Sequence, residues 1–582
     1  AASGTGRTTP PAFAIAASSS LKMSRPSTKR RPREWTPPLA SASSVALNRV
    51  LGQDPSVIMG SLSSNGQVFL LNPHGVLFGR GAQVDVGGLV ASTLRLSDQD
   101  FLAGRYTLTG NDSTQSVVNQ GSLTAANGGY IALIAPQVRN EGTISAPGGT
   151  VALAAGNQVT LTLGDHQLVG LTVDQGAMNA LAENKNLVQA DGGLVILTAK
   201  GQDAVLSGVV NNEGIIQART VSNVNGVIKL LAGMEDDTVQ VSGTLDASAP
   251  NGGDGGFIET SAAHVNAAPD VMVTTNAPYG KTGTWLVDPI DFTIANSGGD
   301  MTPATLASNL VSSNFTIQTA SAGGGNGDIF VSDAVTWNSA NSLTLSAHRD
   351  VNVNAAMTNT GSGGVTLRAD SQGACVTNTA TCGTVNFAGA GHITVTGGPV
   401  NIYYNPAGSH TATPSYATPV DYTGNVTLNG GSVLTAYMLV NDVTQLQAIN
   451  TNRAGNYALG RNIDAAVTST WNGGLGFQPV GNSATNFTGS MNGGGHSISD
   501  LFINRPTQDY VGLFGAASFN ANGLTQIGMI GGSITGQQYI GSLAGSVIAS
   551  GPISDVYAAG TAVTGIVFAA GGLIGYSNSG VT

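Results

Sequence analysis

The sequence has little charge, few aromatic side chains and no long hydrophobic run. Of its 582 residues, 9% are charged and 5% are aromatic, whereas charged residues make up about 25% of a typical globular domain. A hydrophobic content of 41% nevertheless separates it from disordered chains, which are poor in apolar residues and rich in charge. Because no uninterrupted apolar run reaches about 18 residues, we predict no transmembrane segment.

Basic residues are scarce outside the N-terminal region. Residues 1–50 contain one acidic residue, Glu34, and a basic cluster at 22–33, although the whole chain has a net charge of −11. The rest of the chain is therefore acidic, which argues against a nucleic-acid partner because phosphate binding needs a basic face. The cluster at 22–33 could be a nucleic-acid arm or a targeting signal, but the surrounding Pro and Ser favour a disordered tail.

Cysteine is almost absent. Cys375 and Cys382 are the only two, with six residues between them. This spacing allows a disulfide within one loop, which is the expected state in a secreted protein, whereas in the cytosol the two would be free thiols. Two cysteines alone make a poor zinc site, because zinc normally takes four ligands.

Motifs of enzyme chemistry are also missing. The seven histidines are scattered, and neither His-Glu-x-x-His nor Gly-x-Ser-x-Gly occurs. Asp288 and Asp291 could form a carboxylate pair like that of β-helical polysaccharide enzymes, but the Asp288-Pro289 turn explains the first of them. Asp254 is a single carboxylate, whereas calcium needs six to eight oxygens. We predict no enzymatic activity, no cofactor and no metal.

Small residues in a regular repeat dominate the chain, which contains 81 glycines. An Asn-x-Gly or Ser-Gly pair, an apolar residue, Ala, a Gly-containing turn and an alternating apolar strand recur, with copies at Asn119, Asn140, Asn212 and Ser242. A chain of this length needs several domains or a repeat array. A period in the twenties with short strands and glycine turns predicts a β-solenoid.

A four-residue turn, Asn72-Pro73-His74-Gly75, lies between two short apolar runs near the start of this array. Asn accepts local backbone hydrogen bonds at the first turn position, Pro presets φ at the second, and Gly suits the fourth. The flanking runs, 68–71 and 76–78, are typical of buried strands. The turn thus predicts a tight connection between strands at the beginning of the solenoid.

The C-terminal part repeats more strictly. Gly-Leu-Phe-Gly, Ser-Leu-Ala-Gly and Gly-Leu-Ile-Gly place leucines at 513, 543 and 573, two successive spacings of 30. Solenoids need polar caps to protect exposed strand edges, and the third copy ends close to Thr582 without one. We therefore expect the sequence to be part of a longer protein.

Residues 41–93 resemble the N-terminal secretion domain of filamentous-haemagglutinin-like exoproteins, the passengers of two-partner secretion in Gram-negative bacteria. The resemblance implies a right-handed parallel β-helix that a partner outer-membrane transporter recognises. It also implies a secretion motif formed by Asn48, Asn65, Asn72, Pro73 and Gly75. His74 stands where this family often has Asn, a position that tolerates both. Residues 510–576 resemble the GLUG repeats of surface proteins.

These features predict an all-β, elongated molecule with four regions. They are an atypical segment at 1–40, disordered or non-native through a frame error; a two-partner-secretion β-helix at 41–292; a continuing β-rich solenoid at 293–440; and a truncated GLUG-type region at 441–582.

The leading functional hypothesis is a secreted, cell-surface adhesin that binds host-cell or extracellular ligands without catalysis. One alternative is an export scaffold for a missing C-terminal toxin or haem-acquisition module. Another is an extracellular β-helical enzyme that degrades polysaccharide.

Overall fold

The computed structural model describes residues 13–18, 22–23, 44–110, 114–164, 167–322, 324–377, 382–407, 410–548 and 551–578. The chain forms two compact units. Unit 1 comprises residues 1–326 and 335–343, and unit 2 comprises residues 327–334 and 344–582. The boundary differs from the predicted ones at 292 and 440, because similar parallel strands occur on both sides of it and leave no compositional signal.

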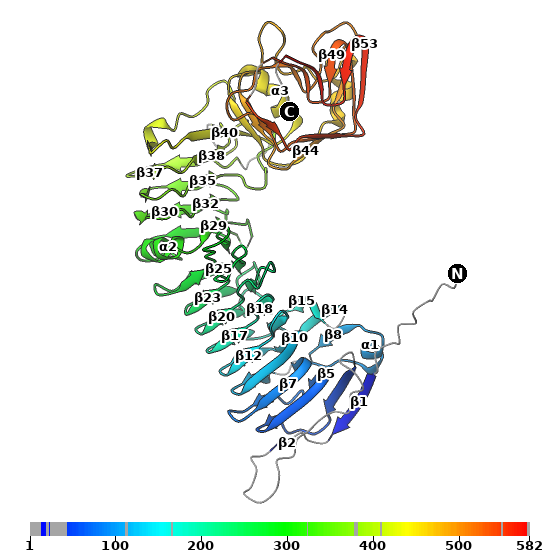
Figure 1. Cartoon of the computed structure of the whole chain (residues 1–582), viewed down its shortest axis with the longest axis vertical. Helices are drawn as coiled ribbons and strands as arrows, with labels where there is room; N and C mark the ends of the chain where they lie inside the picture. Colours follow the sequence, from blue (N-terminus) through cyan, green and yellow to red (C-terminus); the bar gives the residue numbers. More distant parts are fainter. Residues whose placement is uncertain are drawn as a thin grey trace, which may run out of the picture. The chain divides into compact units, whose positions relative to one another are not determined.

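Unit 1 is a stack of coils whose strands pair in parallel with the equivalent strands of the neighbouring coils (Figure 1). The first face comprises β3 (Val45–Val50), β5 (Ser61–Leu71), β7 (Gln83–Ser92), β10 (Ser122–Ala135), β13 (Thr150–Ala155), β18 (Leu194–Ala199), β21 (Val227–Ala232), β24 (Phe257–Ser261), β27 (Thr284–Asp288) and β29 (Asn314–Gln318). The second face comprises the first halves of β5, β7 and β10, followed by β12 (Thr143–Ser145), β17 (Leu187–Gln189), β20 (Ile215–Gln217), β23 (Thr244–Asp246) and β26 (Met272–Thr274). The third face comprises β4 (Ser56–Ile58), β6 (Val76–Phe78), β9 (Ser116–Asn119), β11 (Gln137–Asn140), β16 (Leu181–Asn184), β19 (Val209–Asn212), β22 (Thr238–Val241) and β25 (His264–Ala267). The prediction of an all-β, parallel β-helix is confirmed.

The glycine content follows from how closely the coils approach one another at one corner. A Cβ added to Gly149 would overlap the carbonyl oxygen of Gly129, and a Cβ on Gly193 would overlap that of Gly149. Only glycine lets the backbones of three successive coils come this close. The regular Gly turns of the repeat are therefore a stacking requirement.

Buried asparagines form a hydrogen-bonded column on the third face. The Nδ2 atoms of Asn119, Asn140 and Asn184 donate in turn to the Oδ1 atoms of Asn140, Asn184 and Asn212, each over 2.8 Å. All four side chains are fully buried. Each amide satisfies the polar atoms of its neighbours, so the column can lie inside the coil without a large desolvation cost.

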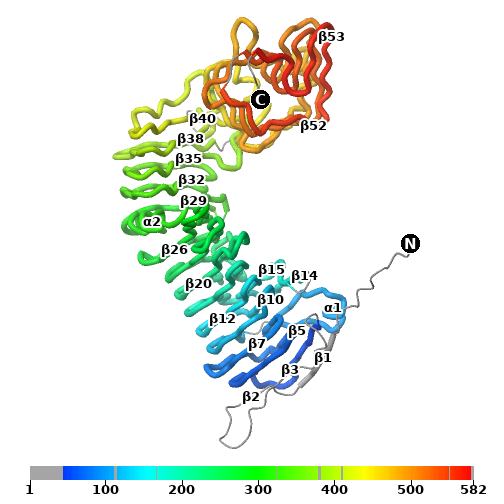
Figure 2. Tube along the Cα trace, in the orientation of Figure 1, coloured from blue at the N-terminus to red at the C-terminus, as the bar shows by residue number. Residues whose placement is uncertain are grey.

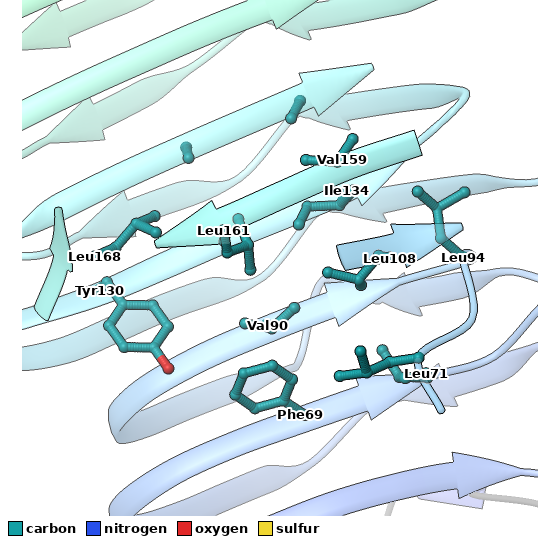
Figure 3. Packing of buried hydrophobic residues seen from close by; sticks show 14 of the residues in the cluster. Phe69, Leu71, Val90, Leu94, Leu108, Tyr130, Ile134, Val159, Leu161 and Leu168 are labelled. Carbon is teal, nitrogen blue, oxygen red and sulfur yellow. The ribbon is translucent and has the colours of Figure 1, made fainter. Parts of the chain in front are cut away.

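A separate antiparallel sheet covers one side of the first coils. It contains β8 (Tyr106–Thr109), β14 (Gln158–Gly164) and β15 (Gln167–Gln175). Figure 3 shows Leu108, Val159 and Leu161 from this sheet beside Phe69 and Val90 of the coils. These side chains are buried, so the first face has apolar packing on both of its sides in this region.

Two strands lie within the N-terminal segment. β1 (Phe13–Ser18) pairs in parallel with Val45–Val50, and β2 (Lys22–Met23) pairs with Val57–Ile58. Two short strands, whose backbones extend the sheets of the first coil, thus lie within the segment 1–40 that was predicted to be disordered or non-native. The basic residues at 24–33 lie outside the described residues.

Unit 2 also consists of parallel coils, whose course can be followed along the trace in Figure 2. One of its sheets runs through β35 (Val365–Arg368), β38 (Val400–Tyr404), β40 (Leu434–Val440), β41 (Asn456–Leu459), β43 (Ser490–Asn492), β47 (Leu524–Thr525) and β51 (Ile553–Ser554). Other parallel sheets comprise β30 (Ile329–Val331), β33 (Val351–Val353) and β36 (Val385–Phe387); β34 (Ala356–Asn359), β37 (His392–Thr396) and β39 (Val426–Asn429); and β42 (Ile463–Asp464), β44 (Ser497–Ser499), β48 (Gly528–Ile530) and β52 (Tyr557–Ala559). A further sheet comprises β45 (Phe502–Asn504), β49 (Ser533–Gly541) and β53 (Ala562–Gly571). The repeated Gly-Leu motifs end in β46 (Phe514–Ala517), β50 (Ala544–Val547) and β54 (Ile574–Ser577), which form another.

The spacing of 30 in unit 2 corresponds to one coil. Ala544 pairs with Phe514 in the preceding coil and with Ile574 in the following one. A Cβ on Gly545 or Gly575 would overlap backbone atoms of the preceding coil. The final glycine of each motif is thus required by close stacking, as at the glycine corner of unit 1.

A disulfide joins Cys375 and Cys382 in unit 2. The loop that it closes is held by buried polar groups: the Asp370 carboxylate accepts from Ala374 N over 2.6 Å, and Cys375 O accepts from Asn441 Nδ2 and Gln445 Nε2 over 2.9 and 2.8 Å. Gln445 lies in helix α3 (Val443–Ala448). The disulfide therefore closes the loop on itself, and the hydrogen bond from Gln445 to Cys375 O attaches it to this helix.

Candidate recognition site

Asn72 fastens the four-residue turn to the neighbouring coil. Its Nδ2 donates to Asp54 O and to Ser56 Oγ, each over 3.0 Å, and its Oδ1 accepts from His74 N over 3.0 Å. The side chain is fully buried. Both Nδ2 donors and the Oδ1 acceptor thus have partners within the fold, so the buried Asn72 side chain shapes the turn and does not face a partner.

Gly75 completes the turn from the other side. Its N–H donates to Asn72 O over 3.1 Å, and its carbonyl oxygen accepts from Ser56 N over 3.0 Å. Its φ of +112° lies in a region that residues with a Cβ rarely adopt. The Asn72 side chain and the Gly75 backbone therefore hold the same residue of the preceding coil, Ser56.

Pro73 and His74 form the outer part of the turn. Pro73 is half-buried and His74 is exposed. With Asn72 and Gly75 buried beneath them, these two residues are the part of the turn that a partner can reach.

The other two residues of the predicted motif lie elsewhere. Asn48 is half-buried in β3 and donates from Nδ2 to Phe69 O over 3.3 Å, which links two coils. Asn65 is exposed at the bend of β5, where its carbonyl oxygen lies close to Gly87 of the next coil. The structure thus brings Asn72, Pro73 and Gly75 together at one corner and leaves Asn65 at another.

Arg49, which follows Asn48, organises the surface near the turn. Its Nη2 donates to Leu96 O over 2.6 Å and lies 2.8 Å from Asp98 Oδ1. Asp98 begins helix α1 (Asp98–Leu102), whose N-cap is Ser97. No role was predicted for Arg49, Ser56 or Ser97. Ser56 is the first residue of a short strand and has no local signal, whereas Ser97 directly precedes an acidic helical turn, a position that favours an N-cap.

Helix α1 is held in place by polar contacts at its first turn. Ser97 Oγ accepts from Asp100 N over 3.0 Å, and Arg105 contacts the Asp100 carboxylate over 2.7 Å. The hydrogen bonds from Ser97 and then Arg105 lower the pKa of Asp100. The helix therefore forms a fixed rim beside the Asn72–Gly75 turn.

Asp254, Asp288 and Asp291, the carboxylates considered for chemistry, do not form a metal site. In the described ranges, no group of three or more His, Cys, Asp or Glu residues is placed to hold a metal ion. Asp254 accepts from Lys281 N over 2.8 Å, as expected of a turn residue. Asp291 is exposed, whereas Asp288 is half-buried at the end of β27.

Asp288 should make the stability of unit 1 depend on pH. Burial, followed by repulsion from Glu259, raises its pKa to about 6, so the folded state holds a proton that the unfolded state releases near pH 4. Stability from this group is complete below about pH 4 and is lost as the pH rises through about 6. We expect Asp288→Asn to match the wild type near pH 3.5 and to exceed it by about 1 kcal/mol at pH 7, allowing for partial exposure.

Urea unfolding at several pH values measures this difference. Asp291→Asn is the matched control, because it removes an exposed carboxylate three residues away. An advantage of Asp288→Asn that stays constant from pH 3.5 to pH 7 would contradict the assignment.

No helix in the described part of the chain has the length and apolar character that a membrane crossing requires.

The fold and the turn together define a class: a parallel β-helix with an antiparallel side sheet and a buried Asn-Pro-x-Gly turn between its first coils. Residues 13–247 match the family model described as the TPS secretion domain. The N-terminal part of the chain is therefore similar to the domain through which exoproteins of two-partner secretion are exported. The match includes β1 and β2, which lie within the segment 1–40 that was predicted to precede this domain.

Curated relatives extend the comparison. The chain is 34% identical over 217 residues to the heme/hemopexin-binding protein of Haemophilus influenzae, covering 35% of this chain and 23% of that protein. It is 41% identical over 132 residues to halomucin of Haloquadratum walsbyi, covering 22% of this chain and 1% of halomucin. The chain thus spans about a quarter, or less, of the length of these relatives.

Among solved structures, the HMW1 secretion domain of Haemophilus influenzae is similar at 18% identity. The alignment covers 72% of this chain and 93% of that one, with a TM-score of 0.43.

Proposed function

We propose that this chain is an exoprotein exported by a partner outer-membrane transporter, which recognises the N-terminal β-helix. The observation that carries the proposal is the match of residues 13–247 to the TPS secretion domain. The turn at Asn72–Gly75 supports it, because two buried residues hold Pro73 and His74 at the surface. The chain is then released to the medium or retained at the cell surface.

Transporter dependence is the direct test. We expect the full chain, co-expressed in a Gram-negative host with a two-partner transporter from the same genome, to reach the medium or the cell surface. Without that transporter it should stay in the periplasm. Immunoblots of medium, intact protease-treated cells and periplasm measure the distribution. Equal release with and without the transporter would contradict the proposal.

We further propose that the exported chain acts as an adhesin without catalysis. Parallel coils repeat similar surfaces along a unit, which suits many weak contacts made at once. Binding of the purified full chain to cultured cells and to immobilised extracellular-matrix proteins tests this role. Urea-unfolded chain serves as the control, and equal binding by both would count against an adhesin.

A second candidate is export of a haem-acquisition function. It is favoured by the similarity to the heme/hemopexin-binding protein, although that alignment covers 35% of this chain. Titration of the full chain with haemin, followed by its absorption spectrum, distinguishes this candidate from the adhesin.

A further inference from the structure

A cationic side chain in unit 2 is half-buried without an acidic partner. Arg368 ends β35, on the opposite side of the strand from buried Val365 and Leu367. Among the described residues its guanidinium makes one hydrogen bond, from Nη2 to Gly460 O over 3.5 Å, and no ion pair. Burial lowers the pKa of Arg368, as expected of a cation that has lost water without gaining a counter-ion. The guanidinium therefore retains N–H donors for an external anion.

Two stacked tyrosines hold this guanidinium in place. Arg368 pairs in register with Tyr403 of β38, and Tyr403 pairs with Tyr437 of β40, which are neighbouring strands (Figure 1). The guanidinium carbon lies 5.5 Å from the centroid of the Tyr403 ring, a distance at which the ring attracts a cation. The two rings stack with centroids 4.9 Å apart and 14° between their planes. The stack restricts the guanidinium before a ligand arrives, which lowers the entropic cost of binding.

Asp370 is the carboxylate whose charge acts on Arg368, but its hydrogen bonds go elsewhere. It accepts from Ala374 N over 2.6 Å and from the Nδ2 atoms of Asn405 and Asn441 over 3.0 and 2.7 Å. The Asp370 side chain is fully buried among these donors. Because the carboxylate serves the disulfide loop, it does not neutralise the Arg368 guanidinium by direct contact.

Further polar groups surround the Tyr403 hydroxyl. Asn492, the last residue of β43, donates from Nδ2 to Tyr403 Oη over 3.4 Å. His496 ends the turn that follows, and its ring makes no hydrogen bond to a described residue. Burial, followed by repulsion from the Arg368 charge, lowers the pKa of His496, so this half-buried ring lies near the guanidinium. A Cβ added to Gly495 in the same turn would meet open space, which leaves room for a ligand at this turn.

We propose that Arg368 and the Tyr403 hydroxyl bind the carboxylate of an acidic sugar, a uronate. A guanidinium presents two parallel N–H groups that match the two oxygens of a carboxylate. The Asn492 amide and the His496 ring supply donors and acceptors for the neighbouring hydroxyls of a sugar, which favours a saccharide over an acidic peptide. The proposal rests on the adhesin role above and gives that role a ligand class.

Calorimetric titration of the purified full chain with sodium glucuronate tests the site. We expect saturable binding of glucuronate, at least tenfold tighter than binding of glucose, which has a similar ring but lacks the carboxylate. Inorganic sulfate and N-acetylglutamate are titrated in parallel. Tighter binding of sulfate than of glucuronate would make this a sulfate site, and tighter binding of N-acetylglutamate would favour a peptide. Either result, or no binding of glucuronate, would overturn the proposal.

Two variants assign the binding to these side chains. Arg368→Gln removes the charge and the paired donors, and it should weaken glucuronate binding at least tenfold. Tyr403→Phe keeps the ring that stacks on Arg368 but removes the hydroxyl, and it should weaken binding about fivefold. Arg80→Gln, at an exposed arginine of unit 1, is the matched control and should bind like the wild type. Unchanged affinity in Arg368→Gln, or in a Tyr403→Phe chain that unfolds at the wild-type temperature, would contradict the assignment.

The outcomes separate this proposal from the adhesin role. Attachment of the full chain to cells, without any binding of glucuronate, would make the site proposal wrong and leave the adhesin role standing. Glucuronate binding that Arg368→Gln removes, in a chain that attaches neither to cells nor to matrix proteins, would support the site and overturn the adhesin role.

Discussion

Gly75→Val is expected to abolish release of the chain while a functional transporter is present. The φ of +112° at Gly75 is a conformation that a β-branched residue does not adopt, and forcing it costs on the order of 1–3 kcal/mol. The turn should open instead, which removes the hydrogen bond from Ser56 N to Gly75 O and displaces Pro73 and His74. Immunoblots of medium and periplasm measure the loss, which we expect to exceed tenfold.

Loss of recognition must be separated from loss of folding. Gly298→Val is a matched control, because Gly298 also has a positive φ, +71°, with open space around it, and lies beyond the matched residues 13–247. Asn72→Ala should reproduce the effect of Gly75→Val, since it removes the hydrogen bonds to Asp54 and Ser56. If Gly298→Val blocked release as strongly, the turn would have no special role in export.

Asn140→Ala is expected to lower the free energy of unfolding by about 2–4 kcal/mol. Asn140 lies in the middle of the asparagine column, accepting from Asn119 and donating to Asn184 over 2.8 Å. Its removal leaves two buried polar atoms without these partners, and each such loss costs about 1–3 kcal/mol. Urea unfolding followed by circular dichroism measures the change.

Asn266→Ala provides the comparison for this column. Asn266 lies in β25 on the same face, but its side chain is exposed, and its replacement should change stability by less than about 0.5 kcal/mol. Similar effects of both substitutions would show that the column does not stabilise the coils.

The repeats and the turn were predictable because their causes are local. Asn72, Pro73 and Gly75 each have a strong preference for one turn position, and the structure places them accordingly. The repeat copies at Asn119, Asn140 and Asn212 begin with asparagines of the buried column. They recur in the sequence because strands that stack in register place equivalent side chains above one another. Asn184 was missed, since the spacing from Asn140 to Asn184 is 44 residues. The extra length contains β14 and β15, which leave the coil to form the side sheet.

The two N-terminal strands could not be predicted from the sequence for a related reason. Phe13–Ser18 has no turn or repeat that marks it as a strand, and its parallel pairing with Val45–Val50 spans more than 30 residues of chain. The basic cluster at 22–33, between these two segments, is typical of a disordered tail and does not indicate a strand. Whether a segment at the edge of a stack forms a strand depends on the coil that it pairs with, and the composition of the segment does not reveal that pairing.

The sequence by itself determined that the chain forms stacked β-coils and that a tight turn lies near their beginning. Both follow from local preferences of Gly, Asn and Pro and from a repeat that stacking imposes. Only the tertiary structure decided which residues of the turn reach the surface and which residues from other coils lie next to the turn. Leu51, His74 and Arg95 are far apart in sequence and meet at one groove because three coils stack their corners there. No local pattern carries that information, since the groove exists only once the coils have closed.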